Sequence, residues 1–192
     1  MSIRIRRWSG WLLLVGSAIF IVGNLLGFVL PDSATSVQLV FLFIGALLVL
    51  GGLPAFYRKQ ARQVGWLGLC GFIALLLAEV LLGIVVNILF AVVSSAGSAQ
   101  IFPLILLIAF VGAALGLIGG LLFGVMTIRA RVFPAAIGWF LIVAGILNLA
   151  FISPLPGGVG GIISEIVFSL VFGWMGYLLA LRTSEVTAPS PA

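Results

Sequence analysis

The sequence contains no histidine, a single cysteine and few charged residues, which make up 7% of the chain. Without histidine, His-ligated haem, His-based metal sites and Ser–His or Cys–His catalysis are excluded. One cysteine cannot form an intramolecular disulfide, and since Cys70 lies in an apolar run we expect no redox role for it. Soluble domains carry about 25% charged residues, so the low charge content also excludes a soluble protein.

Long apolar runs fill most of the 192 residues, of which 64% are hydrophobic, and the mean hydropathy is +1.42. A membrane-spanning helix needs roughly 20 apolar residues. The sequence therefore predicts an all-α polytopic membrane protein, a six-helix transmembrane bundle formed by residues 1–182, with a disordered cytoplasmic tail at 183–192. The predicted spans are residues 8–30, 37–57, 64–90, 101–128, 135–152 and 162–181.

The first run follows a basic arm at residues 1–7 and could be mistaken for a signal peptide. Its length exceeds the 7–15 apolar residues typical of a signal-peptide core. We therefore expect it to be a retained first helix rather than a cleaved segment.

The nine basic residues indicate the orientation. They lie in the N-terminal arm, in connectors at 58–62 and 129–131, and at Arg182, whereas the other three connectors hold only Asp32 as a charged residue. With six spans, all of the basic segments fall on one side of the membrane. The positive-inside rule places that side, with both termini, in the cytoplasm. Basic residues confined to connectors do not form the patch that nucleic-acid binding requires, so no nucleic-acid partner is expected.

Glycine recurs at every fourth residue in the fourth predicted span, at Gly112, Gly116, Gly120 and Gly124. In a membrane this spacing creates a groove that admits a neighbouring helix backbone. Gly23 and Gly27 have the same spacing and can pair with this stripe, within the chain or between chains. Because the stripe runs from mid-membrane to the cytoplasmic end, we expect it to close the bundle on that side and to lie clear of any chemical site.

Asn24, Glu79, Asn148 and Glu165 lie well inside the predicted spans, all in the outer half of the membrane. On a helical wheel Asn24 and the two glutamates each fall on the face that carries small residues, so we expect them to point into the bundle. Two carboxyl groups at one level can bind and release a proton, or coordinate a cation together with the asparagines. Alternatively, a protonated glutamate joins two helices by a hydrogen bond. For the two asparagines, helix joining is the favoured interpretation.

Other patterns point to no chemistry. Residues 157–161 are rich in glycine but lack the lysine of a phosphate-binding loop, and Ser94, Ser95 and Ser98 have no basic partner nearby. We therefore expect neither a cofactor nor enzymatic activity.

The segment 119–139, with its glycine-rich span, its short Arg-containing connector, a proline and the Gly138-Trp139 pair, resembles small multi-pass bacterial membrane proteins of unknown function. The resemblance implies a bacterial cytoplasmic membrane and no particular activity. The function we expect is that of a structural, interaction or lipid-associating membrane protein, whose partners are the bilayer and a membrane protein or a second copy of the chain. The alternative is a small transporter, or a proton- or cation-coupled carrier, that uses Glu79 and Glu165.

Overall fold

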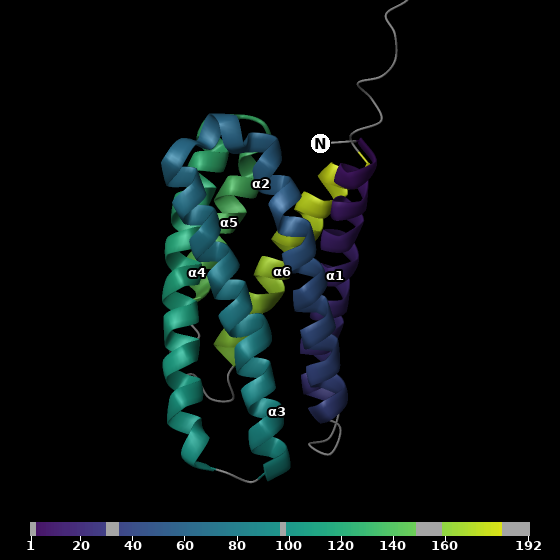
Figure 1. Ribbon diagram of the computed structural model, residues 1–192, viewed down its shortest axis with the longest axis vertical. Helices are drawn as coiled ribbons and strands as arrows, with labels where there is room; N and C mark the ends of the chain where they lie inside the picture. The colour runs from purple at the N-terminus through teal and green to yellow at the C-terminus, as the bar shows by residue number, and fades with distance from the viewer. Residues whose placement is uncertain (1–2, 30–34, 97–98, 149–158, 182–192) are drawn as a thin grey trace, which may run out of the picture.

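The chain folds into packed helices, and the residues that the structure describes contain no strand. The computed structural model describes residues 3–29, 35–96, 99–148 and 159–181 (Figure 1). Its helices are α1 (Ile3–Val29), α2 (Thr35–Glu79), α3 (Asn87–Ala96), α4 (Phe102–Ala130), α5 (Ala135–Leu147) and α6 (Val159–Ala180). A π-helical segment, η2 (Val80–Val86), joins α2 to α3, and a short 3-10 turn, η3 (Ala99–Ile101), precedes α4. The predicted all-α class is therefore confirmed.

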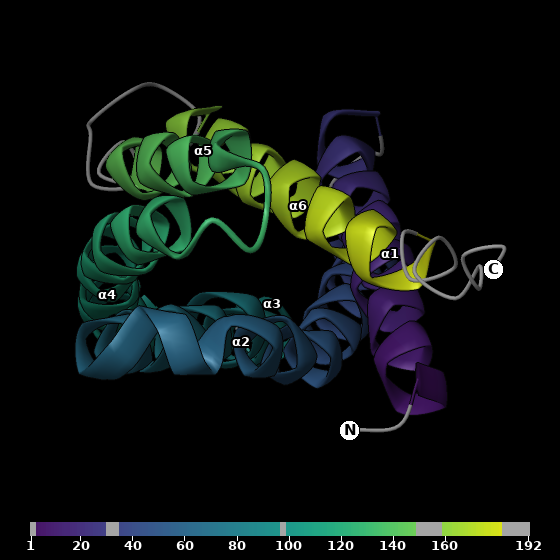
Figure 2. The same ribbon diagram turned by 90° about the horizontal axis from the view of Figure 1, so that it is seen from above.

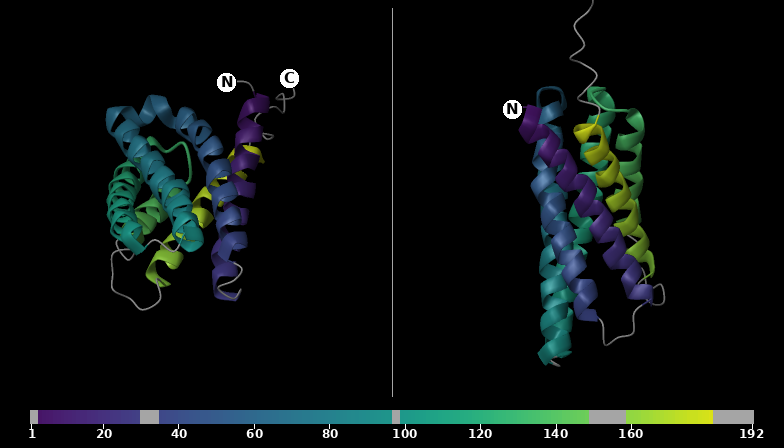
Figure 3. Two further views of the ribbon diagram at one scale, coloured as in Figure 1. Left: turned by 60° about the horizontal axis from the view of Figure 1, so that its bottom comes forward. Right: turned by 90° about the vertical axis from the view of Figure 1, so that its right-hand side faces the viewer.

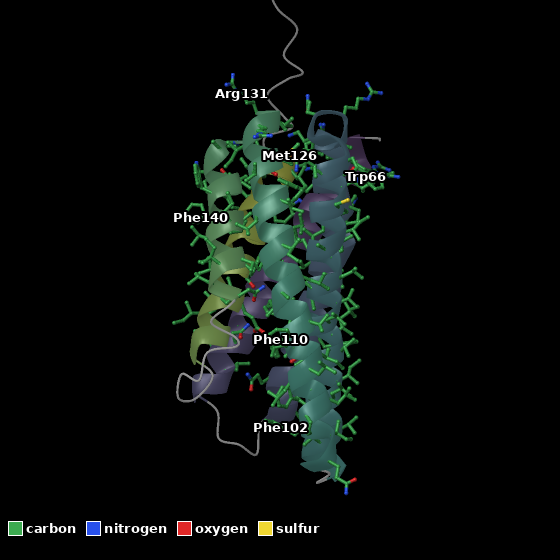
Figure 4. The ribbon with its side chains drawn as sticks, turned by 90° about the vertical axis from the view of Figure 1, so that its left-hand side faces the viewer. Trp66, Phe102, Phe110, Met126, Arg131 and Phe140 are labelled. Atoms are coloured by element: carbon green, nitrogen blue, oxygen red, sulfur yellow. The ribbon has the colours of Figure 1, made fainter. Side chains whose placement is uncertain are left out.

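Four helical stretches are long and apolar enough to cross a membrane: Arg4–Gly27, Ser36–Val93, Phe102–Ala130 and Ile163–Ala180. The shorter α5 is also apolar. Large apolar side chains such as Phe102, Phe110 and Phe140 are about half exposed on the outside of the helices (Figure 4). An apolar outer surface of this extent marks a contact with lipid or with another protein. These features are compatible with a membrane protein.

The helices form a closed ring in which α1 packs on α2, α2 on α4, α4 on α5, α5 on α6, and α6 on α1 again (Figure 2). The start of α1, the connection between α4 and α5 and the end of α6 lie at the same end of the molecule (Figures 1 and 3). We call this the basic end, because it carries the basic residues of α1, α2 and the α4–α5 connection; Arg131 is labelled there in Figure 4.

Within α2 the chain reverses direction at Gly65, whose φ of 58° and ψ of −159° are not helical. Figure 1 shows the first part of α2 rising to the basic end and the second part descending toward η2 and α3. Tyr57 and Phe72 stack across the bend with their ring centroids 4.5 Å apart. Further from the bend, Gly83 lies against the side chain of Ala46. The residues on either side of Gly65 therefore form an antiparallel helical pair.

The predicted connector at 58–62 is wrong in its position, because these residues are helical and the bend follows at Gly65. Arginine, lysine, glutamine and alanine are all favourable in helices, so a cluster of charge does not end one. Gly65 lacks a Cβ atom and adopts a positive φ without steric cost. The backbone therefore turns at Gly65, which has no side chain, and not at the charged residues 58–62.

Replacing Gly65 by alanine is expected to destabilise the protein by about 1–3 kcal/mol, because a residue with a Cβ atom is strained in this conformation. Crowding is not the cause, since no atom lies within 4 Å of the added Cβ. Gly51→Ala is the matched control, because Gly51 is exposed in the helical part of α2 and alanine favours a helix there. Thermal unfolding in detergent measures both variants. An unchanged midpoint for Gly65→Ala would contradict the left-handed bend.

Other helix ends also differ from the predicted spans. Most of the basic arm is helical, because α1 begins at Ile3 and no proline or glycine interrupts residues 3–7. Helix α5 runs from Ala135 to Leu147 with Asn148 as its C-cap, and the predicted end of this span at residue 152 lies outside the described residues. Helix α6 begins at Val159, inside the segment rich in proline and glycine. The predicted tail at 183–192 lies outside the described residues.

The four stripe glycines are all buried inside the chain itself. Gly112 lies against Leu82 of η2, and Gly116 lies against Asn148. Gly120 and Gly124 lie against the backbone of α5. The close helix contacts expected from the stripe are therefore present, and both partner surfaces belong to the same chain.

Within the chain, Gly23 and Gly27 do not pack on the stripe, so the predicted pairing of the two motifs is wrong in its intramolecular form. Gly23 lies against Leu42 and Gly27 against Gln38, both of which belong to α2. The same glycine spacing on several helices carries no information about which of them meet. The order of the helices in the ring determines which surfaces meet, since α1 packs on α2 and not on α4.

Candidate functional site

The polar residues predicted inside the spans meet around one small cavity. Glu79, Glu165 and Asn148 line it, and Asn24 reaches it through a side-chain hydrogen bond to Glu165. The cavity measures about 30 Å³, which is room for about two water molecules. The other lining residues are Phe20, Leu75, Ala78, Leu82, Gly83, Gly116, Phe168, Ser169 and Phe172. Side chains that are far apart in the sequence thus share one interior space.

The two carboxyl groups come from different helices, Glu79 from α2 and Glu165 from α6. Both side chains are partly buried, and they are close enough to interact electrostatically. No lysine or arginine is among the described residues that line the cavity. A pair of carboxyl groups in such a place can share a proton, or can ligate a cation if further oxygen ligands are present.

Asn24 presents hydrogen-bond donors to the site. It is 2% exposed, and its Nδ2 donates to the backbone carbonyl oxygen of Phe20 at 3.1 Å. A carbonyl can only accept, so this contact determines which end of the amide is the nitrogen. The hydrogen bond to Glu165 comes from the same side chain. Asn24 therefore links α1 to α6 and supports the carboxyl group.

Asn148 lies at the C-terminal end of α5 and lines the cavity. Its Oδ1 accepts a hydrogen bond from Ser164 Oγ at 2.9 Å, and its Nδ2 faces Gly116. A side chain at position 116 would collide with this amide. Asn148 is therefore held between α4 and α6, and its oxygen already has a partner.

Gly116 belongs to the site as well as to the packing stripe, since it lines the cavity. The expectation that the stripe lies clear of the site is therefore wrong at this position. The reason is that Asn148, the C-cap of α5, lies directly against Gly116 of α4.

The π-helical segment η2 begins directly after Glu79. Segments of this kind are rare and frequently occur at functional sites. Gly83 lies within it beside the carboxyl group, because a Cβ atom there would approach Glu79 Oε1 to 3.2 Å. The side chain of Asn87 donates from Nδ2 to the carbonyl oxygen of Gly83 at 2.9 Å. The widened turn thus makes space for Glu79, and Asn87 satisfies a carbonyl of that turn.

Sequence reasoning missed Asn87 and Ser164 as part of this arrangement, and it did not foresee η2. Asn87 follows Gly83 by one turn on the face that also carries Glu79, which is a signal that could have identified it. Ser164 has no such signal, because a serine beside Glu165 acquires its role only through contact with Asn148.

An aromatic layer separates the cavity from the basic end. Phe56 is fully buried and contacts Phe123 at 6.0 Å and Phe133 at 4.1 Å between ring centroids. Phe72 and Tyr57 complete the layer through further ring contacts. On α4, Phe123 lies about 10 Å along the helix from Gly116 toward the basic end.

A second buried polar pair lies beyond this layer. Gln60 Nε2 donates to Thr127 Oγ1 at 3.1 Å, and both side chains are fully buried. Thr127 follows Phe123 by one turn of α4 toward the basic end. The interior therefore alternates from the polar cavity to an aromatic layer and then to a polar pair.

Within the described ranges no group of three or more His, Cys, Asp or Glu residues is positioned to hold a metal ion. The chemistry that the site offers is that of two carboxyl groups with amide donors. No family model, curated protein or solved structure matched the chain.

Proposed function

We propose that the chain is a small membrane carrier in which Glu79 and Glu165 take up and release protons. One observation supports this most directly: carboxyl groups from two helices line one interior cavity. Ionisable groups inside a membrane bundle are costly and mark pathways or proton relays more often than they stabilise a fold. In this conformation the cavity has room for about two water molecules, which suits a proton and is too small for an organic substrate.

A proton is favoured over a metal cation because of the way the asparagines are oriented. Small hard cations in proteins are bound by several oxygen ligands. Asn24 offers its nitrogen to Glu165, and the oxygen of Asn148 already accepts from Ser164. Beyond the two carboxyl groups, the described lining offers a cation the hydroxyl oxygen of Ser169, whereas amide donors stabilise a carboxylate after its proton has left.

For the topology we propose six spans with both termini in the cytoplasm. The candidate span Ser36–Val93 has 58 residues, which exceeds the roughly 20 that one crossing needs, and the bend at Gly65 divides it in two. Helix α5 has 13 residues, about 20 Å of helix, and we count it as the fifth span although it is shorter than the hydrocarbon core is thick. The basic end is then the cytoplasmic end.

In this proposal the aromatic layer around Phe56 and Phe123 closes the cavity toward the cytoplasm. Tightly packed rings exclude water, so a proton cannot pass while the layer is intact. Transport therefore requires the layer to open in a second conformation, as in carriers that expose a central site to each side in turn.

An interaction protein is the second candidate. The glycine stripe supports it less than its sequence spacing suggested, because the stripe is not free to bind a partner protein. All four stripe glycines are covered by η2, α5 and Asn148 of the same chain. A partner membrane protein would have to use the apolar outer faces of the helices instead. Those faces are equally suited to lipid.

Proton movement into proteoliposomes tests the proposal. A potassium diffusion potential, negative inside, is imposed with valinomycin, and a trapped dye reports the internal pH. We expect acidification with the wild-type protein that is absent in protein-free vesicles and with the double variant Glu79→Gln/Glu165→Gln. Replacing external sodium by choline should leave the rate unchanged. Equal rates for wild-type and double-variant vesicles would contradict proton carriage, and a rate that requires sodium would indicate a cation instead.

A further inference from the structure

A separate feature lies on the outside of α1 at the basic end. Of the described residues, Arg4, Arg7, Trp8 and Trp11 line a hollow of about 730 Å³. All four side chains are exposed, and Trp8 is 66% exposed although it is a large apolar residue. A hollow with two guanidinium groups and two indole rings combines a cationic part with an apolar part.

The spacing of these residues places them on one face of α1, because positions 4, 7, 8 and 11 follow the three- and four-residue steps of a helix. The neighbouring face is used by the fold: Gly10 lies against α6, and Leu13 lies against Gly52 of α2. The bundle thus buries one side of this helix turn, and no described helix covers the Arg–Trp side.

The two arginines have no carboxyl group near them among the described residues. Glu79 and Glu165 are the acidic residues of the described ranges, and both line the interior cavity. A guanidinium group is a planar fork of N–H donors that matches a phosphate group. The hollow is therefore complementary in charge to a phosphate ester.

We propose that this hollow binds the headgroup of an anionic phospholipid, with the phosphate between Arg4 and Arg7 and the glycerol region against Trp8 and Trp11. Tryptophan is enriched where the headgroups of a bilayer meet its hydrocarbon core, since its ring is apolar and its N–H is polar. Because α1 crosses that level beside these residues, a lipid reaches the hollow from the bilayer without a change of fold. The proposal does not depend on proton carriage.

Quenching of Trp8 and Trp11 by brominated lipids tests the proposal. Trp66, Trp139 and Trp174 are replaced by phenylalanine, so that the fluorescence reports the hollow alone. The protein is reconstituted in phosphatidylcholine with increasing fractions of brominated phosphatidylglycerol, or of brominated phosphatidylcholine as the neutral probe. We expect the anionic lipid to quench at a clearly lower fraction than the neutral lipid does.

Two charge variants make the test specific to this hollow. Arg4→Gln/Arg7→Gln should weaken the preference for the anionic lipid at least about tenfold, since each basic residue near the surface contributes about fivefold. Arg58→Gln/Arg62→Gln removes the same charge from exposed positions of α2 and should leave the preference unchanged. All four arginines are exposed, and unfolding curves confirm that each variant is folded.

Three results would overturn the proposal. The first is equal quenching by the two lipids, and the second is equal loss of preference in both double variants, which would indicate general surface charge. The third is a preference for the anionic lipid that is abolished by adding soluble glycerol phosphate. A preference that is seen only after deletion of residues 183–192 counts in the same way. Either form of that result would assign the hollow to another occupant.

Discussion

Replacing Gly120 by leucine is expected to prevent the helices from assembling correctly. The ideal Cβ position of residue 120 lies 2.6 Å from the backbone carbonyl oxygen of Leu141 and 2.9 Å from Cα of Gly145. Both contacts are with the backbone of α5, which cannot move aside as a side chain can. Overpacking typically costs about 1–3 kcal/mol and more where backbone must shift, a large part of the roughly 5–15 kcal/mol that keeps a domain folded.

Size-exclusion chromatography and thermal unfolding in detergent measure this effect. Gly51→Leu is the matched control, because Gly51 is exposed and its added Cβ would meet only Leu12, at an ordinary 3.6 Å. We expect Gly51→Leu to behave like the wild-type protein, whereas Gly120→Leu should aggregate or unfold at a clearly lower temperature. Gly116→Leu should do the same, since it collides with Asn148. Normal expression and unchanged midpoints for both variants would refute the packing described for α4.

Glu79→Gln is expected to abolish proton flux while leaving the protein folded. Glutamine has nearly the size of glutamate, so it fills the space beside Gly83, and it can still donate or accept a hydrogen bond. It cannot bind or release a proton near neutral pH. A role in transport and a role in joining helices therefore predict different outcomes, because interhelical hydrogen bonds in membrane proteins contribute only about 0.6 kcal/mol on average.

The comparison requires flux and stability to be measured on the same preparation. Flux through Glu79→Gln should fall to that of protein-free vesicles, with an unfolding midpoint close to that of the wild-type protein. Glu79→Asp keeps the titratable group and should retain part of the flux. A glutamine variant that transports normally, or that loses flux only in proportion to folded protein, would remove the basis for a carrier centred on Glu79.

Part of the candidate site was predictable from local pattern. Asn24, Glu79 and Glu165 each share a helical face with small residues, and small residues indicate the side that meets other helices. That argument placed them inside the bundle but said nothing of their partners. The hydrogen bond between Asn24 and Glu165, and the one between Ser164 and Asn148, join residues of different helices. Such pairs depend on how helices are rotated and shifted against each other, which composition does not specify.

The sequence by itself determined the helical class and the apolar outer surface, because both follow from the length and hydrophobicity of the runs. It also located the interior polar residues and the glycines that permit close packing. The place where α2 turns has a local cause that the prediction missed, since helix-forming residues carry the helix past the charged segment to Gly65. Only the tertiary structure decided which helices the glycines pack against. It also decided that the turn after Glu79 is π-helical. The physical reason is the same throughout: burial and helicity are properties of a segment, whereas contacts and cavities are properties of several segments packed together.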